Sequence, residues 1–386
     1  MGVRVIVIGG GVAGAATALA LCRGGADVTV YEAYEDPAGE VGSFVSLASN
    51  GLRGLDALGC LARVRAAGVD VPRQRMWSAG GHLLGDVPRG RVSGDPLHSV
   101  TLMRGRLVAE LRQAAQEAGA RIVTGARLTG LTETAAEVVV EFADGRRDTA
   151  DLLVAADGIW STVRGLLDPA APRPEYAGLY SVSGVSRMAD VEPGVFNMTF
   201  ARNGAFLHLA VGDEVWWSAQ VAEPVEPDRN GVDWLARVAE LYKEATPSAV
   251  LAATTRLQPT VILHAVDPIQ TWHTDRLVLI GDAAHPVGAG QGASMAIEDA
   301  LALAAALRTE PAIPDALTAY DTERRPRIVK VLRTAEDNRG AKKAGPVKRW
   351  LQAVMMRVFV PLVYERATAW LYSYEPARQR ERAGSR

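Results

Sequence analysis

The stretch VIVIGGGVAGAATALALCRGGADVTVYE, residues 5–32, decides the fold of this 386-residue chain. An apolar run over residues 3–8 predicts a buried strand, and the alanine-rich segment 12–23 predicts a helix. Residues 27–31 predict the next strand. Strand, helix and strand in this order are typical of a βαβ unit, in which the two strands are parallel.

Three glycines follow the first strand at the spacing G-x-G-x-x-G: Gly9, Gly11 and Gly14. The first permits a tight turn, the second lets the backbone approach a pyrophosphate, and the third allows the helix to pack closely on the strand. The helix N-terminus then offers N–H groups and partial positive charge to phosphates. Glu32 ends the second strand, where it can accept hydrogen bonds from a ribose diol and would repel a 2′-phosphate. The loop predicts a site for FAD or NAD and does not choose between them.

A second glycine-rich turn, GDAAHPVGAGQGA at 281–293, follows the apolar run 277–280. Asp282 places a carboxylate beyond the C-terminal end of a strand, where ligands collect in open α/β sheets. Gly288, Gly290 and Gly292 let the backbone approach a flat group, and the helix expected from about Ala293 directs its N–H groups at negative charge. A ligand longer than one dinucleotide loop can hold is implied. FAD is such a ligand, with its pyrophosphate on the first loop and its flavin at the second.

These two turns and a third segment resemble the motifs of the group A FAD-dependent monooxygenases, the para-hydroxybenzoate hydroxylase family. The third segment, VAADGIWSTVR at 154–164, resembles the Asp-Gly motif of that family, and GDAAHP at 281–286 resembles its Gly-Asp motif. Weaker matches at 46–59, 104–107 and 320–327 extend the resemblance to most of the chain. The resemblance and the two glycine-rich turns assign the following residues to FAD: Gly9, Gly11, Val12, Ala13, Gly14, Glu32, Ser46, Arg104, Asp157, Gly158, Arg164, Gly281, Asp282, Gly290, Gln291, Gly292 and Ala293.

The predicted fold class is α/β, with a discontinuous Rossmann-like FAD-binding domain at 1–70, 98–174 and 271–340. A mainly antiparallel substrate-binding sheet, from 71–97 and 175–270, is inserted into it, and residues 341–386 form a C-terminal helical region. Single helices are expected over 50–67 and 232–244, and an irregular region over 68–96. A basic amphipathic helix within 347–372 is expected to pack over the FAD-binding domain rather than lie on a membrane.

The resemblance implies that NADH or NADPH reduces the flavin, that O2 adds at its C4a position, and that the hydroperoxide transfers oxygen to an aromatic or polyene-like molecule. Pro286 is expected to border the space above the flavin, and His208 is a candidate base for a phenol. Tyr180, Phe206 and Trp217 are candidates for the substrate wall, although such strand aromatics are more often core residues. Only one of the adjacent pair Trp216 and Trp217 is expected to face the flavin, because strand residues alternate between faces.

Composition bounds the remaining possibilities. A net charge of −2 gives no electrostatic reason for a nucleic-acid partner, and two cysteines fit reduced thiols in a cytoplasm. No apolar run suffices for a membrane span, and no Cys/His set has the spacing of a zinc site. The chain is expected to be a monomer or homodimer. A halogenase or reductase on the same fold, a drug-inactivating monooxygenase and a flavoprotein that only sequesters a ligand remain alternatives.

Overall fold

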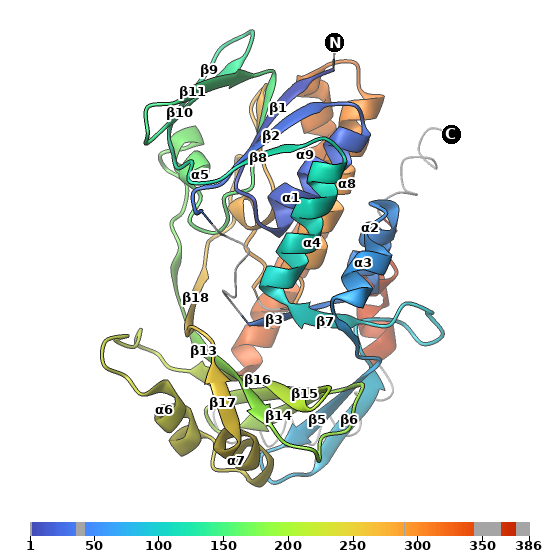
Figure 1. Cartoon of the computed structure of the whole chain (residues 1–386), viewed down its shortest axis with the longest axis vertical. Coiled ribbons are helices and arrows are strands. Elements are labelled where there is room, and N and C mark those ends of the chain that lie inside the picture. The colour runs from blue at the N-terminus through green and yellow to red at the C-terminus, as the bar shows by residue number, and fades with distance from the viewer. Residues whose placement is uncertain (1, 36–42, 289, 343–363, 376–386) are drawn as a thin grey trace.

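The computed structural model describes residues 2–35, 43–288, 290–342 and 364–375. A five-stranded parallel sheet forms the upper half of the molecule in Figure 1, in the order β19-β12-β1-β2-β8. Its strands are β1 (Arg4–Ile8), β2 (Asp27–Tyr31), β8 (Arg121–Val123), β12 (Leu152–Ala155) and β19 (Leu277–Leu279). The predicted βαβ unit is therefore present at the centre of this sheet.

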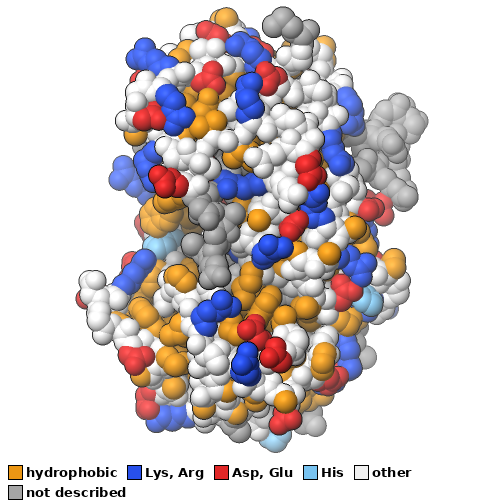
Figure 2. Space-filling model, in the orientation of Figure 1, with side chains coloured by type: hydrophobic (Ala, Val, Ile, Leu, Met, Phe, Trp, Pro, Cys, Tyr) orange, Lys and Arg blue, Asp and Glu red, His pale blue; other side chains and the backbone are white. Residues whose placement is uncertain are grey.

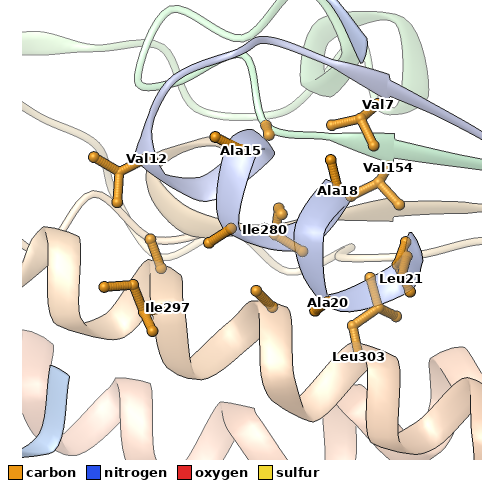
Figure 3. Close-up of a cluster of buried hydrophobic side chains, with 14 of the residues drawn as sticks. Val7, Val12, Ala15, Ala18, Ala20, Leu21, Val154, Ile280, Ile297 and Leu303 are labelled. Atoms are coloured by element: carbon orange, nitrogen blue, oxygen red, sulfur yellow. The ribbon is translucent and has the colours of Figure 1, made fainter. Parts of the chain in front are cut away.

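Helix α1 (Val12–Arg23) packs between this sheet and α8 (Gly292–Thr309), with α4 (Arg104–Glu117) beside it. Figure 3 shows the contact, in which Ala15 and Ala18 of α1 face the sheet while Ile297 and Leu303 of α8 approach from the other side. Ala15 and Ala18 are fully buried. Small side chains let α1 approach both neighbours closely, which brings the start of α1 near the start of α8.

An eight-stranded sheet forms the lower half, in the order β17-β13-β16-β15-β14-β5-β6, with β18 paired to β13. Every pairing is antiparallel except that of β14 with β5. Its strands are β5 (Arg73–Ser78), β6 (Leu83–Pro88), β13 (Glu175–Arg187), β14 (Val195–Ala201), β15 (Gly204–Val211), β16 (Glu214–Ala222), β17 (Thr254–Leu257) and β18 (Val261–Ala265). All of them fall within the segments expected for the substrate-binding domain, whose boundaries stay a prediction.

Two small sheets and further helices complete the described part. In Figure 1 β3 and β7 of the sheet β3-β7-β4 lie between the two large sheets, whereas α6 and α7 lie below the lower one. The remaining elements are β3 (Phe44–Leu47), α2 (Ser49–Ala57), α3 (Leu61–Ala66), β4 (Val69–Asp70), β7 (Val100–Met103), β9 (Leu128–Glu133), β10 (Val138–Phe142), β11 (Arg147–Ala150), α5 (Thr162–Leu167), α6 (Trp234–Leu241), α7 (Ala245–Ala252), the 3-10 turn η1 (Gly281–Ala283) and α9 (Ile313–Lys342).

Three local predictions differ from the structure. The helix expected over 50–67 is two helices, α2 and α3, because Gly59 between them has a φ of +59°. The region 68–96, expected to be irregular, contains β4, β5 and β6, the last two within the eight-stranded sheet. The helix expected over 232–244 is shorter, and a second helix, α7, follows it. Most of the amphipathic helix expected within 347–372 lies outside the described residues, which are helical over 364–372.

The visible face in Figure 2 carries positive and negative side chains side by side, without a broad area of one sign. This distribution agrees with the small net charge of −2. Among the helices of the described ranges, none combines the length and apolar character that crossing a bilayer requires.

Candidate functional site

The first glycine-rich loop has the geometry that its spacing predicts. Gly9 has a φ of +98°, a conformation that side chains disfavour, and a Cβ there would lie 2.5 Å from the Ala156 carbonyl oxygen. A Cβ at Gly14 would overlap the Gly9 carbonyl oxygen, so the helix and the strand leave no room for one. At Gly11, in contrast, a Cβ would meet no protein atom within 4 Å. The second glycine therefore borders open space, and α1 begins directly behind it without a side-chain cap.

Glu32 closes this loop from the end of β2. Its Oε2 accepts a hydrogen bond of 2.7 Å from the Gly10 amide, and its Oε1 accepts one of 3.1 Å from the Tyr34 amide. Arg112 donates from Nε to the Gly10 carbonyl at 2.8 Å, and its Nη2 lies 3.9 Å from Glu32 Oε2. The carboxylate is thereby held at the strand end, where the sequence predicts contact with a ribose.

The Asp-Gly segment, 154–164, lies against the first loop. Asp157 accepts hydrogen bonds from the Ser161 hydroxyl at 2.5 Å and from the Val163 amide at 3.1 Å, which tie it to the start of α5. Burial raises the pKa of Asp157 above its ordinary value, against the lowering effect of these donors. Arg164 donates from Nη1 to the Ala283 carbonyl at 3.0 Å and joins this segment to the second glycine-rich turn.

The Gly-Asp turn meets the first loop directly, since a Cβ at Gly281 would lie 2.8 Å from the Cβ of Ala13. Asp282 is exposed, although the surrounding protein raises its pKa by desolvation. The positive charge of Arg104, at the start of α4, acts on this carboxylate in the opposite sense. Asp282 is therefore reached by water although nearby protein partly desolvates it, and its Oδ1 is 3.6 Å from where a Cβ of Gly292 would be.

A buried ion cluster that sequence reasoning missed supports this turn from behind. We use this name for Glu298, Asp299, Arg324 and Arg327, with His285 and Asn50 hydrogen-bonded to them. Arg324 donates to Asp299 Oδ1 at 2.8 Å and to Glu298 Oε2 at 2.7 Å, and all three side chains are fully buried. Arg327 donates to both oxygens of Glu298, at 2.7 and 2.8 Å. The arginines lie within the 320–327 match, and their i, i+3 spacing on a helix was the signal available.

Asp299 connects the cluster to the turn. Its Oδ2 accepts a hydrogen bond of 3.0 Å from the Gly281 amide and lies 2.6 Å from His285 Nε2. Burial alone would disfavour the ionised form of Asp299, but the charges of His285 and Arg324 outweigh it and hold the pKa well below the ordinary value. The carboxylate is thus ionised and fixes the backbone immediately before Asp282.

The eight-stranded sheet presents one face to this site. We call the inner face the side on which Phe196, Leu207, Leu209 and Trp216 pack against Phe44 of β3. The rings of Phe44 and Trp216 are stacked with centroids 6.4 Å apart, and those of Phe44 and Phe196 meet edge to face at 6.2 Å. This face is aromatic and apolar, and it lies next to the strand that carries Ser46.

The structure places the three substrate candidates on the opposite face of the sheet. Tyr180, Phe206 and Trp217 are fully buried in a cluster with Val238 of α6 and Leu251 of α7. They therefore contribute to the outer core and not to a wall facing β3, and Trp216 is the member of the tryptophan pair that faces inward. The choice of Trp217 was wrong because apolarity alone does not tell which face of a strand is covered by helices.

His208 shares this outer location, since it is paired in register with Trp217. Burial lowers its pKa to about 4, and its Nδ1 has no partner in the described part of the chain. It is therefore not placed to deprotonate a substrate on the inner face. Pro286, by contrast, is partly buried beside His285 in the second turn.

The three motif segments assigned to FAD by the sequence contact one another, Gly281 against Ala13 and Arg164 against Ala283, and Ser46 lies on β3 next to the inner face. Ser46 Oγ lies 2.7 Å from Thr101 Oγ1, which holds β3 against β7. Gln291 occupies the N-cap position of α8, but its side chain makes no capping hydrogen bond. Like Gly11, Gly290 borders open space. Two helix N-termini, an exposed carboxylate and open backbone along the site fit FAD, which needs donors for its phosphates and for its flavin ring.

The fold and the site thus define an FAD-binding protein. A family model described as an FAD binding domain matches residues 2–335. Aurachin C monooxygenase/isomerase of Stigmatella aurantiaca is 31% identical over 377 residues, which cover 91% of each chain. The 6-hydroxynicotinate 3-monooxygenase of Pseudomonas fluorescens is 30% identical over 87% of this chain and 91% of its own. The fold matches that of a variant of Klebsiella pneumoniae HpxO complexed with FAD, with a TM-score of 0.84, 22% identity and coverage of 95% and 97%.

The chain belongs to this FAD-binding family of aromatic-ring monooxygenases, the group that its three motifs resemble. The prediction of FAD as cofactor and the predicted fold class are both confirmed.

Proposed function

We propose that the protein is a single-component monooxygenase that uses NADH or NADPH and O2 to hydroxylate or epoxidise an aromatic or polycyclic small molecule. The observation that carries the proposal is the meeting of the three motif segments beside an aromatic inner face. The curated relatives named above are monooxygenases by name, and they cover nearly the whole chain at about one third identity.

Bound FAD would supply the electron storage and the activation of O2, chemistry that amino-acid side chains lack. The chain supplies binding and positioning. The N-terminus of α1 offers N–H groups to the pyrophosphate, and the exposed carboxylate of Asp282 offers an acceptor to sugar-chain hydroxyls. The N-terminus of α8, which has no side-chain cap, would stabilise negative charge on the flavin ring.

The inner face has a different role in this proposal. Phe44 and Trp216, which are partly exposed, offer an apolar surface to a planar substrate and exclude water from the reacting atoms, and the buried Phe196 packs against Phe44. Because His208 lies on the outer face, it cannot act on a substrate at the inner face. The chain would therefore direct the reaction by orienting the substrate on the inner face and by excluding water there.

The test is substrate-dependent oxidation of NADH and NADPH by the FAD-loaded protein, with ¹⁸O2 incorporation measured by mass spectrometry. The panel contains hydroxybenzoates, hydroxynicotinates, kynurenine and hydroxyquinolines. Stimulated oxidation with one labelled oxygen atom in the product is expected. Oxidation without labelled product would indicate a reductase, and a chloride-dependent product would indicate a halogenase. Absence of stimulation and of labelled product across the panel would contradict the proposal.

A further inference from the structure

The described C-terminal segment, residues 364–375, connects the two halves of the molecule, and we call it the strap. It is helical over 364–372, and Figure 1 shows it in red between α2 and β6. At its lower end Glu365 Oε1 accepts a hydrogen bond of 2.6 Å from the Ser93 amide. Beside it, Tyr364 packs against side chains of β5 and β6, namely Met76, Leu84 and Val87.

The upper end of the strap is a helix C-terminus whose carbonyl groups accept hydrogen bonds from arginines. The last carbonyls of a helix have no partner within it. Arg327 donates from Nη1 to the Trp370 carbonyl at 3.1 Å and from Nη2 to the Leu371 carbonyl at 3.0 Å. Arg53 of α2 donates to the Tyr372 carbonyl at 2.5 Å. Two cations thus meet the negative end of the helix, which is the favourable arrangement for its dipole.

Aromatic rings add to the contact at this end. Lys330 Nζ lies 4.0 Å from the ring centroid of Trp370, and the guanidinium carbon of Arg327 lies 3.8 Å from that of Tyr374. Three strap side chains are buried here: Leu371, Tyr372 and Tyr374. Undocking the strap would expose these side chains, so docked and undocked are two distinct states.

Arg327 is also a member of the buried ion cluster, so one guanidinium holds both the strap and Glu298. Both oxygens of Glu298 accept hydrogen bonds from Arg327, and Oε2 accepts another from Arg324. Arg324 in turn donates to Asp299, whose Oδ2 accepts a hydrogen bond of 3.0 Å from the Gly281 amide. A continuous series of hydrogen bonds involving charged groups therefore leads from the Gly-Asp turn to the strap.

We propose that FAD binding and docking of the strap are coupled through the buried ion cluster, so that the loaded cofactor holds the strap against the eight-stranded sheet. A ligand on the Gly-Asp turn favours the turn geometry in which Gly281 bonds Asp299, and this geometry supports the arginines that hold the strap. Coupling of this kind is reciprocal, so a docked strap strengthens FAD binding by the same factor. Met198 packs against both the inner-face residues and the cluster under Tyr364, so the strap steadies one edge of the inner face.

Hydrogen exchange, followed by mass spectrometry on the full chain with and without saturating FAD, tests the coupling. Peptides from 364–375 should exchange about fivefold more slowly or better when FAD is bound, the lower end of typical coupling between linked sites. Peptides from α6 and α7 in the outer core are the internal reference for a general stabilisation. The measurement involves no turnover, so its result does not depend on the proposed reaction.

A pair of variants isolates one anchor of the strap. Arg53 also pairs with Asp95, and among the described residues its contacts are with this acid and the strap and not with the buried ion cluster. Asp95→Asn alone is the control, because it removes the ion pair and keeps the bond to the Tyr372 carbonyl. Adding Arg53→Met to this variant should remove the FAD-dependent protection of the strap and raise the Kd for FAD about fivefold or more.

A third variant tests the route of the coupling. Arg327→Lys keeps a cation beside Glu298 but lacks the planar fork that also reaches the carbonyls, so it should lose the FAD-dependent protection as well. Circular dichroism and the thermal midpoint of each apoprotein show that the variants are folded.

The inference fails if bound FAD protects the strap in the unaltered protein no more than it protects the reference peptides, a result that requires no variant. An unchanged Kd for FAD on adding Arg53→Met to Asp95→Asn would also overturn it. So would full FAD-dependent protection of the strap in Arg327→Lys, since the coupling would then bypass the buried ion cluster.

Discussion

Replacing Arg324 with methionine should destabilise the protein far more than removing a surface arginine at the same ion-pair distance. Arg324 contacts Asp299 and Glu298 at 2.8 and 2.7 Å with all three side chains fully buried. Arg147 contacts Glu141 at 2.6 Å, with 72% and 47% of their side chains exposed. The two sites thus have similar ion-pair distances, and they differ in how deeply the paired side chains are buried.

The magnitude follows from what remains after the substitution. Glu298 keeps Arg327 and Asn50, and Asp299 keeps His285 and the Gly281 amide, but the buried ion cluster gains one uncompensated negative charge. Breaking a buried pair in this way costs about 3–5 kcal/mol. The exposed pair lost in Arg147→Met is worth about 0–1 kcal/mol.

Urea unfolding of the FAD-loaded protein, followed by flavin fluorescence and circular dichroism, measures both variants. The pH dependence supplies a second readout. In the unaltered protein the pKa of Asp299 is lowered, so its stabilising contribution is present above about pH 3.9 and is lost as the pH falls. In Arg324→Met that pKa should rise, and the deficit relative to the unaltered protein should shrink as the pH falls from 7 toward 4. Equal losses in the two variants, or a deficit independent of pH, would refute the reasoning.

Three further predictions concern other parts of the molecule. Gly11→Val should abolish FAD binding in titrations, while the apoprotein keeps its thermal midpoint. Gly14→Ala should lower the thermal midpoint of the apoprotein, because a Cβ has no room at Gly14 and has room at Gly11. Equal midpoints for the two variants would contradict this prediction. Trp217→Ala should cost about 3–5 kcal/mol in urea unfolding, whereas Trp216→Ala should chiefly raise the Kd for aromatic ligands. The pKa of His208 is lowered to about 4, so stability should be full above pH 6.5 and fall by up to about 3 kcal/mol toward pH 4, and His208→Gln should flatten that slope.

The cofactor side of the site could be predicted from the sequence because it depends on backbone. A loop that must approach a phosphate needs glycines at fixed spacing, and the strand, helix and acid around it restrict the alternatives. Gly9, Gly11, Gly14 and Glu32 therefore have the predicted geometry. The Gly-Asp turn follows the same logic at a second helix start.

The substrate side could not be predicted in the same way. Alternation along β16 shows that Trp216 and Trp217 face opposite sides, but only the positions of α6, α7 and β3 decide which side is which. The segment 68–96 is rich in glycine, proline and arginine, and nothing in that stretch shows that it forms strands of the second sheet.

The strand order of the parallel sheet bears on how the protein is made. β19, at 277–279, pairs with β12, at 152–155, and the whole stretch that supplies β13 to β18 is translated between them. During synthesis, β19, the edge strand of the parallel sheet, therefore leaves the ribosome only after the strands of the eight-stranded sheet. The place beside β12 can be filled by β19 only after more than a hundred further residues have been made, so the glycine-rich turn at 281–293 is the last of the three motif segments to be synthesised.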